Sequence, residues 1–376
     1  MLVMVYFNSM SAAGGIERVI ASHIGFMCEM HQIVLATKDF YPSFYPLSIE
    51  VQRESLHVDF TMNMESRWRR VAKIAFSSLR TITALRQLFK NSVPCVVYVA
   101  SPLNLLEVFL AGMDMRRIVV TEHSSFSAYN WVYKKIISKL YPSVGLLTVP
   151  TKLDSEGYSR RGIRSAYVPN PISFYPNEIS DLSSKWALCV GRLTHDKRHD
   201  LLLDIWHLSD IQRLGWKLRI IGKGECESDL RKKIDALGLN ESVLIEEPTS
   251  KIQEKYIASS IFLLTSRAEG FGLVLAEAMA CGVPCICFDC PSGPRDIVDE
   301  GLTGRLLKEG DILGYVEALR DLAMNPIRRL ELGQRARLSV KKFQAETVSE
   351  EFMRVFSEAF APCTDGNSFT HNFDRK

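Results

Sequence analysis

The sequence predicts an α/β protein made of two Rossmann-like domains, each built on a parallel sheet. Three observations lead to this fold class. The chain has 376 residues, 47% of them hydrophobic, which is enough for two separate cores. Short apolar runs alternate with segments of helical period along its length. A stretch rich in proline and asparagine, residues 168–180, lacks a helical pattern and is the expected linker between domains 1–170 and 171–376.

The alternation is most regular in the second domain. Expected strands are residues 186–190, 217–221, 243–247, 261–265, 284–288 and 304–307, and loops followed by helix-like segments separate most of them. Because parallel strands need a crossover connection, usually a helix, this order predicts a doubly wound sheet.

The first domain repeats the pattern less regularly. Its expected strands are residues 3–7, 32–37, 95–100, 117–123 and 145–149. Two such domains facing each other would form a cleft, and ligands of open α/β sheets bind at the carboxyl ends of the strands. Residues 338–360 have a helical pattern and could pack back on the first domain, whereas the polar residues 363–376 are expected to fray.

Charge and composition narrow the functional classes. Formal net charge is +3, but residues 1–170 carry 19 Lys/Arg against 12 Asp/Glu, whereas residues 171–376 carry 27 against 31. The basic first domain indicates an anionic surface or substrate. No apolar run reaches the roughly 18–20 residues of a membrane span, and the N-terminus lacks the basic region of a signal peptide. Nine cysteines without framework spacing suit a reducing cytoplasm.

The basic charge is concentrated in residues 65–90, which hold seven Lys/Arg and one Glu. One helical face would carry apolar side chains, namely Trp68, Ala72, Ala75, Leu79, Ile82 and Phe89. Such a segment can lie on an anionic membrane, or it can be a core-packed helix with a solvated basic face. Both interpretations stay open. Nucleic-acid binding is disfavoured because no recognised motif accompanies the patch.

The most informative motif is "AEGFGLVLAEAM" (268–279), which follows the expected strand 261–265. It places Glu269 in a loop and Glu277 inside a helix that begins near Leu273, so both carboxylates can face one pocket. The backbone amides of Phe271, Gly272 and Leu273 at the helix start could receive an anion. A structural role near the helix dipole explains Glu269 well. It explains Glu277 poorly, because the neighbouring residues are apolar.

Two cations follow the expected strand 186–190, in "GRLTHDKRH". Arg192 and Lys197 would suit a diphosphate, although a solvated basic loop is the simpler interpretation. The sequence contains no Asp-x-Asp pair. A nucleotide-diphosphate enzyme without such a pair must stabilise its leaving group with protein cations or helix dipoles.

Three further features are weaker. Gly15, in "GGIER", could allow close approach to a phosphate or could simply form a tight turn. His123, after Glu122 at the end of an expected strand, would face the cleft, but a lone histidine is more often structural. The closely spaced cysteines could suggest a metal site, but they lie in an apolar strand pattern and lack zinc-knuckle spacing; they are Cys281, Cys285, Cys287 and Cys290.

Together these motifs resemble the retaining glycosyltransferases of family 4, which have the GT-B fold. The resemblance is carried by Glu269 and Glu277 in "EGFGLVLAEAMACGVP", by "GRL…K", "GGIER" and "EHS", and by "GPRDIVDEGLTGRLL" (293–307). It covers most of the chain and is strongest over residues 186–307.

The resemblance implies specific roles for the site residues. Glu277 would bind the ribose of a nucleotide sugar, Glu269 the transferred sugar, and Arg192 with Lys197 the diphosphate. His123 would lie near the donor sugar and Gly15 near its phosphate.

The expected reaction transfers a hexose or N-acetylhexosamine from a UDP-sugar, with retention and without a metal or other cofactor. The acceptor would be a polyprenyl-diphosphate-linked glycan in bacterial surface polysaccharide synthesis, at the inner face of the cytoplasmic membrane. Two alternatives are a sugar-nucleotide epimerase of the same fold and a non-catalytic sugar-nucleotide-binding protein.

Overall fold

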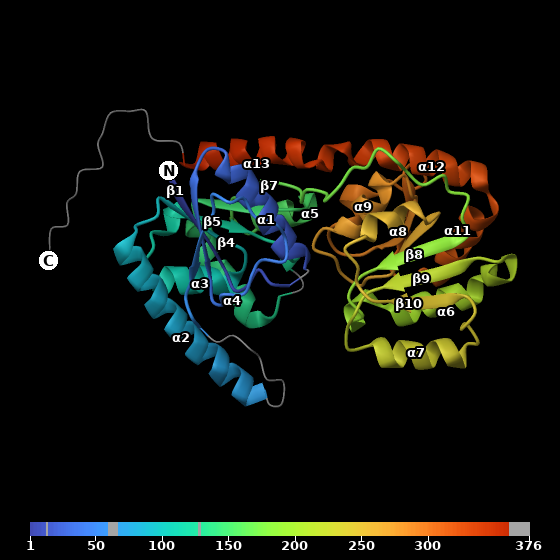
Figure 1. Ribbon diagram of the computed structural model, residues 1–376, viewed down its shortest axis with the longest axis horizontal. Helices are drawn as coiled ribbons and strands as arrows, with labels where there is room; N and C mark the ends of the chain where they lie inside the picture. Colours follow the sequence, from blue (N-terminus) through green and yellow to red (C-terminus); the bar gives the residue numbers. More distant parts are fainter. Residues whose placement is uncertain (13, 59–66, 127–128, 361–376) are drawn as a thin grey trace.

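The computed structural model describes residues 1–12, 14–58, 67–126 and 129–360, with side chains throughout except at residues 67–72. Two parallel sheets organise these residues (Figure 1). Within the described ranges the first sheet has seven strands in the order β3-β2-β1-β4-β5-β6-β7, and the second has six in the order β10-β9-β8-β11-β12-β13. The predicted α/β fold class with two Rossmann-like sheets is therefore confirmed.

The first sheet contains β1 (Leu2–Phe7), β2 (Gln32–Thr37), β3 (Gln52–Ser55), β4 (Val96–Val99), β5 (Ile118–Thr121), β6 (Leu146–Val149) and β7 (Ala166–Tyr167). The second contains β8 (Trp186–Val190), β9 (Lys217–Ile221), β10 (Val243–Glu246), β11 (Ile261–Leu264), β12 (Cys285–Asp289) and β13 (Gly304–Lys308). Between them, residues 168–185 contain neither helix nor strand.

Helices cover both faces of each sheet. In the first half they are α1 (Gly15–Cys28), α2 (Arg67–Asn91), α3 (Pro102–Leu110), α4 (Trp131–Leu140) and α5 (Lys152–Ser159). In the second half they are α6 (His199–Ser209), α7 (Glu227–Ala236), α8 (Ile252–Ile257), α9 (Leu273–Ala280), α10 (Pro294–Ile297), α11 (Ile312–Met324) and α12 (Pro326–Ser339). The last helix, α13 (Ala345–Phe360), packs on the first half. Across the described residues, no helix is long and apolar enough to span a membrane.

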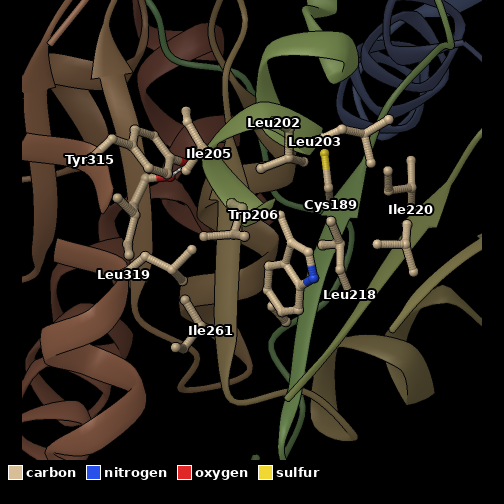
Figure 2. Packing of buried hydrophobic residues seen from close by; sticks show 14 of the residues in the cluster. Cys189, Leu202, Leu203, Ile205, Trp206, Leu218, Ile220, Ile261, Tyr315 and Leu319 are labelled. Carbon is tan, nitrogen blue, oxygen red and sulfur yellow. Dashed lines mark hydrogen bonds between the residues drawn. The ribbon is translucent and has the colours of Figure 1, made fainter. Parts of the chain in front are cut away.

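The core of the second half follows from side-chain alternation along its strands. In β12, Ile286 and Phe288 pack beneath α6 and α11, whereas Cys285 and Cys287 pack on the opposite face with α9. Figure 2 shows the first of these faces, with Trp206 of α6 at its centre. The two strand cysteines are fully buried and take part in the core as small apolar side chains.

The helical pattern predicted over residues 338–360 is interrupted in the structure. Helix α12 ends at Ser339, and Gln344 has an extended backbone, so that α13 begins only at Ala345. Helix α13 then runs back along the first half beside α1 (Figure 1). Its apolar face, including Phe352 and Phe356, completes the first core on that side. Residues 363–376, predicted to fray, lie outside the described residues.

Helix α2 differs from its predicted arrangement. Ile82 and Leu85 are buried against the first sheet, but Leu79, predicted on the same face as Ile82, is 65% exposed. The buried stripe contains Thr81, Ile82 and Leu85, and Leu79, six residues before Leu85, lies about 120° from Leu85 around the helix and outside that stripe. Phe76 is exposed beside Leu79. The predicted face residues Trp68 and Ala72 lie outside the described side chains.

The strand orders fix where a ligand can bind. The order in which strands are added reverses between β1 and β4 in the first sheet, and between β8 and β11 in the second. Loops diverge at such points and leave a crevice at the carboxyl ends of the strands. These two edges face each other, because His123, just after β5, lies directly against Gly270, which follows β11.

One buried carboxylate of the first half lies behind this edge. Glu122 accepts hydrogen bonds from the hydroxyls of Tyr129, at 2.6 Å, and of Tyr141. Burial raises the pKa of Glu122 to about 7, and the two tyrosine hydrogen bonds act in the opposite direction. Glu122 is therefore part of a tyrosine cluster in the core and not of the edge that His123 occupies.

We expect Phe352→Ala to lower the free energy of unfolding by about 3–5 kcal/mol. Phe352 is fully buried and stacks on His23 with ring centroids 4.2 Å apart, so that truncation leaves a cavity between α13 and α1. Urea denaturation followed by circular dichroism measures the change. Ser357→Ala, on the exposed side of α13, is the matched control and should shift stability by less than about 0.5 kcal/mol. Equal stability of the two variants would contradict this account.

Glu122 also predicts a pH dependence of stability. Its carboxyl group deprotonates near 4.5 in the unfolded chain and near 7 in the fold. Between these values the folded state holds a proton that the unfolded state has lost, so the stabilising contribution present below pH 4.5 disappears as the pH rises to 7. The free energy of unfolding falls by at most about 1.4 kcal/mol per pH unit in this range because of Glu122. Urea titrations at pH 4.5, 5.5 and 7 should show that Glu122→Gln lacks this decline in stability. If stability fell equally with pH in the variant and the wild type, Glu122 would not be its cause.

Candidate active site

The loops after β8 and β11 come together at the switch point of the second sheet. Lys197, in the loop after β8, pairs with Glu269 in the loop after β11, with Nζ and Oε1 2.8 Å apart. Both side chains are largely buried, at 17% and 9% exposure. The Thr265 hydroxyl fixes the two loops by donating to the carbonyls of Lys197, at 3.2 Å, and Arg198, at 3.0 Å. The structure therefore brings together two predicted site residues 72 positions apart.

Arg192 lies in the same loop as Lys197 and is exposed. Burial raises the pKa of Glu17, in the first turn of α1, and the positive charge of Arg192 partly offsets this rise. Arg192 therefore acts electrostatically on a helix of the other half. Arg192 thus lies at the junction of the two halves, where the loops after β5, β8 and β11 meet the starts of α1 and α9. This is the place expected of a cation that contacts an anion bound between the halves.

Glu277 is only 2% exposed and is held from both halves of the chain. Its Oε1 accepts from a guanidinium nitrogen of Arg18, in α1, and from Ser173 Oγ at 2.8 Å. Its Oε2 accepts from Tyr256 Oη at 3.1 Å. The interpretation that the surroundings of Glu277 give no structural reason for its charge is thus wrong. Its helix neighbours are apolar, but the partners come from elsewhere in the chain.

The sequence motifs do not point to Arg18, Ser173 and Tyr256 as partners of Glu277. Arg18 could have been identified as a site residue from the sequence, because it belongs to the motif "GGIER" and lies three residues after Gly15, on the same turn of α1. Ser173, in the segment between the sheets, and Tyr256, in α8, stand in no motif. Only the fold brings these two to the carboxylate.

The starts of α1 and α9 also meet at the junction. A Cβ atom on Gly15 would lie 4.0 Å from Cδ1 of Leu273. Neither helix has a side-chain cap, since Gly14 and Gly272 occupy the N-cap positions. Such uncapped first-turn amides can bind an anion. The Phe271 side chain, by contrast, is buried against Phe343, so that Phe271 can contribute to this site only through its backbone.

His123 completes the junction on the side of the first half. Both of its ring nitrogens are buried without a hydrogen-bond partner among the described residues. Burial lowers the pKa of His123 to about 4, so the ring is neutral at physiological pH. Its carbonyl oxygen lies so close to Gly270 that any Cβ there would overlap it. A glycine is therefore required where the Glu269 loop contacts the first half.

No three His, Cys, Asp or Glu side chains in the described residues are grouped closely enough to hold a metal ion. The junction instead combines cations with paired carboxylates and two helix starts. Cations and helix starts suit a diphosphate, and carboxylates suit sugar hydroxyls. The site thus has the chemistry needed for a nucleotide sugar.

Comparisons with known proteins agree with this chemistry. Residues 176–339 match the family model described as glycosyl transferases group 1. An uncharacterized glycosyltransferase of Haemophilus influenzae is 27% identical over 362 residues, covering 93% of this chain and 98% of the relative. A Campylobacter jejuni α-1,4-N-acetyl-D-galactosaminyltransferase, whose named substrate is an undecaprenol-diphosphate-linked glycan, is 25% identical over 92% of this chain and 96% of its own length.

A solved structure supports the fold over most of the chain. The lipopolysaccharide outer core galactosyltransferase superimposes with a TM-score of 0.72 at 22% identity, covering 95% of this chain and 99% of that one. With residues 176–339 matching the glycosyl transferases group 1 model and glycosyltransferases among its relatives, the chain is a glycosyltransferase with the GT-B fold.

Proposed function

We propose that this glycosyltransferase moves a hexose or N-acetylhexosamine from a UDP-sugar to a lipid-linked glycan, with retention of configuration, in bacterial surface polysaccharide synthesis. One observation carries the proposal. The Lys197–Glu269 pair and the buried Glu277 converge with the starts of α1 and α9 at the junction of the two sheets. A nucleotide sugar needs this combination of contacts, and a ligand bound there would contact both halves.

The relatives support the choice of substrates. The Campylobacter relative is named for transfer to an undecaprenol-diphosphate glycan. A relative from Salmonella typhimurium, a lipopolysaccharide 1,6-galactosyltransferase, is 36% identical over 117 residues, 30% of this chain. Both act on bacterial surface glycans or their lipid-linked precursors. The epimerase and the non-catalytic binding protein find no such support among these relatives.

The site residues take complementary roles in the proposed reaction. Glu277 binds the ribose hydroxyls, and Glu269 binds hydroxyls of the transferred sugar. Lys197 and Arg192 hold the diphosphate, whose phosphates lie by Gly15 and the amides of Gly272 and Leu273 at the helix starts. The neutral His123 lies near the sugar and can donate a hydrogen bond without adding charge.

The proposed chemistry depends on stabilising the leaving group. The bond between the anomeric carbon and the diphosphate oxygen breaks first, giving an oxocarbenium-like sugar. The acceptor oxygen then bonds to the anomeric carbon on the face that the diphosphate leaves, and its proton passes to the departing phosphate. Negative charge on the diphosphate grows during this step, so Arg192, Lys197 and the helix starts stabilise the transition state more than the ground state. We propose that no metal is needed.

Helix α2 supports a membrane location for the acceptor. Its exposed side carries Phe76 and Leu79, at 61% and 65% exposure, with Arg80 over the Phe76 ring at 5.4 Å. Arg86 and Lys90 continue the basic side toward its end. Exposed apolar groups set among cations suit the interface of an anionic bilayer. We propose that this side of α2 rests on the inner face of the cytoplasmic membrane, where lipid-linked acceptors are accessible.

Substitutions at the donor site test the reaction. Glu277→Gln and Arg192→Ala should each lower UDP release from UDP-sugar by at least about tenfold, because a hydrogen bond to a charged group contributes about 1.5–3 kcal/mol. A coupled assay with lipid-linked acceptor measures the rate, and calorimetry measures UDP binding. Arg213→Ala is the matched control, since that side chain is 81% exposed on the surface of the second half. Unchanged turnover in both site variants would refute the assignment.

A second substitution set tests the membrane surface. The triple variant Phe76→Ser, Leu79→Ser, Arg80→Glu should sediment with phosphatidylglycerol vesicles at least roughly fivefold less, because one basic residue at an anionic surface is worth about 1 kcal/mol. The double variant Arg231→Glu, Lys232→Glu, on the exposed side of α7, reverses a larger charge elsewhere and should bind normally. If both variants lost vesicle binding equally, overall charge and not α2 would determine membrane binding.

A further inference from the structure

The hydrogen bonds of Glu277 leave little room for another ligand. A carboxylate offers about four acceptor positions on its two oxygens. Three are used, by Arg18 and Ser173 on Oε1 and by Tyr256 on Oε2. A ribose diol donates two hydrogen bonds when both hydroxyls bind one carboxylate. At least one protein donor must therefore give way when Glu277 binds ribose.

Arg18 is the donor best able to leave. Tyr256 is fully buried, and it packs with Phe262 in the core of the second half. The hydroxyl of Ser173 is on a short side chain, and the segment that carries it is fixed nearby by the backbone bond from Ile172 to Phe343 at 2.8 Å. Arg18 has a long side chain, 27% exposed, and it belongs to the other half of the chain. Its displacement requires only rotation about its own bonds.

Arg18 also has unused donors where a diphosphate would lie. Its Nε is buried without a hydrogen-bond partner, while the guanidinium stacks over Tyr45 at 5.2 Å. Both described contacts to Ser173 and Glu277 use a single nitrogen, Nη1. The residue stands on the first turn of α1, next to the uncapped amides that face the start of α9. A guanidinium with free donors at this position can bind phosphate oxygens in a fork.

We propose that Arg18 is a donor-binding residue of the first half that changes partners, pairing with Glu277 in the absence of nucleotide and with the diphosphate once ribose occupies Glu277. This inference rests on the proposed function, in which Glu277 binds the ribose. The exchange keeps the junction closed, because a bond from residue 18 to residue 277 is replaced by bonds from both halves to one ligand. It also keeps the buried carboxylate hydrogen-bonded in both states, because the ribose hydroxyls replace the Arg18 guanidinium as donors.

Binding of UDP and of uridine to Arg18→Ala separates this role from a structural one. UDP carries the diphosphate, whereas uridine carries only the ribose and base. We expect the variant to bind UDP at least tenfold more weakly by calorimetry. Its affinity for uridine, measured by NMR titration at millimolar concentrations, should be unchanged or higher because a competitor for Glu277 is removed. Arg18→Lys should recover part of the UDP affinity, and Arg231→Ala, on exposed α7, is the control.

The outcomes distinguish this inference from the proposed function. Parallel losses of UDP and uridine affinity would make Arg18 a structural residue and overturn the exchange, as would UDP affinity equal to that of the wild type. Failure of the wild-type chain to bind UDP, or binding that Glu277→Gln leaves unchanged, would instead refute the donor site itself.

Discussion

Every pair of neighbouring strands in the described residues is parallel, so each strand must be followed by a segment that returns the chain to the opposite end of the sheet. The carboxyl ends of all strands in a sheet therefore lie on the same side of that sheet, and the loops that follow them lie close together. Because the carboxyl ends of the two sheets face each other, the loops after β5, β8 and β11 and the start of α1 meet at one junction. The position of the candidate active site is a consequence of this parallel pairing.

The junction is held by charges that neither half could bury alone. Glu277 lies on a helix whose other buried residues are apolar, and its negative charge would be costly there without a partner. Arg18, from the other half, supplies that partner. The backbone contact between His123 and Gly270 and the hydroxyl contact between Ser125 and Ser292, at 3.1 Å, bind the same two edges. The proposed donor site and the contact between the halves thus use the same residues.

The C-terminal helix shows why chain order and domain architecture differ. Helix α13 follows the second half in sequence, yet Phe352 and Phe356 fill the core of the first. On α1 the buried His23 stacks against Phe352, so that without α13 this side of α1 would lose its cover. Each half therefore depends on the other for part of its environment, and movement of one sheet relative to the other must be accommodated by residues 168–185 and by the break at Gln344.

The sequence by itself determined most of the strands and their order of appearance, because hydrophobic period and glycine-rich loops are local properties of the chain. It also located the loops with Arg192, Lys197 and Glu269, since these directly follow apolar strands. It did not reveal the polar edge strand β3, the two-residue β7, or the outward turn of Leu79, which depend on what packs alongside. Nor could it pair Arg18 with Glu277, 259 positions apart, because a contact between domains has no local signature and arises only when the two sheets meet.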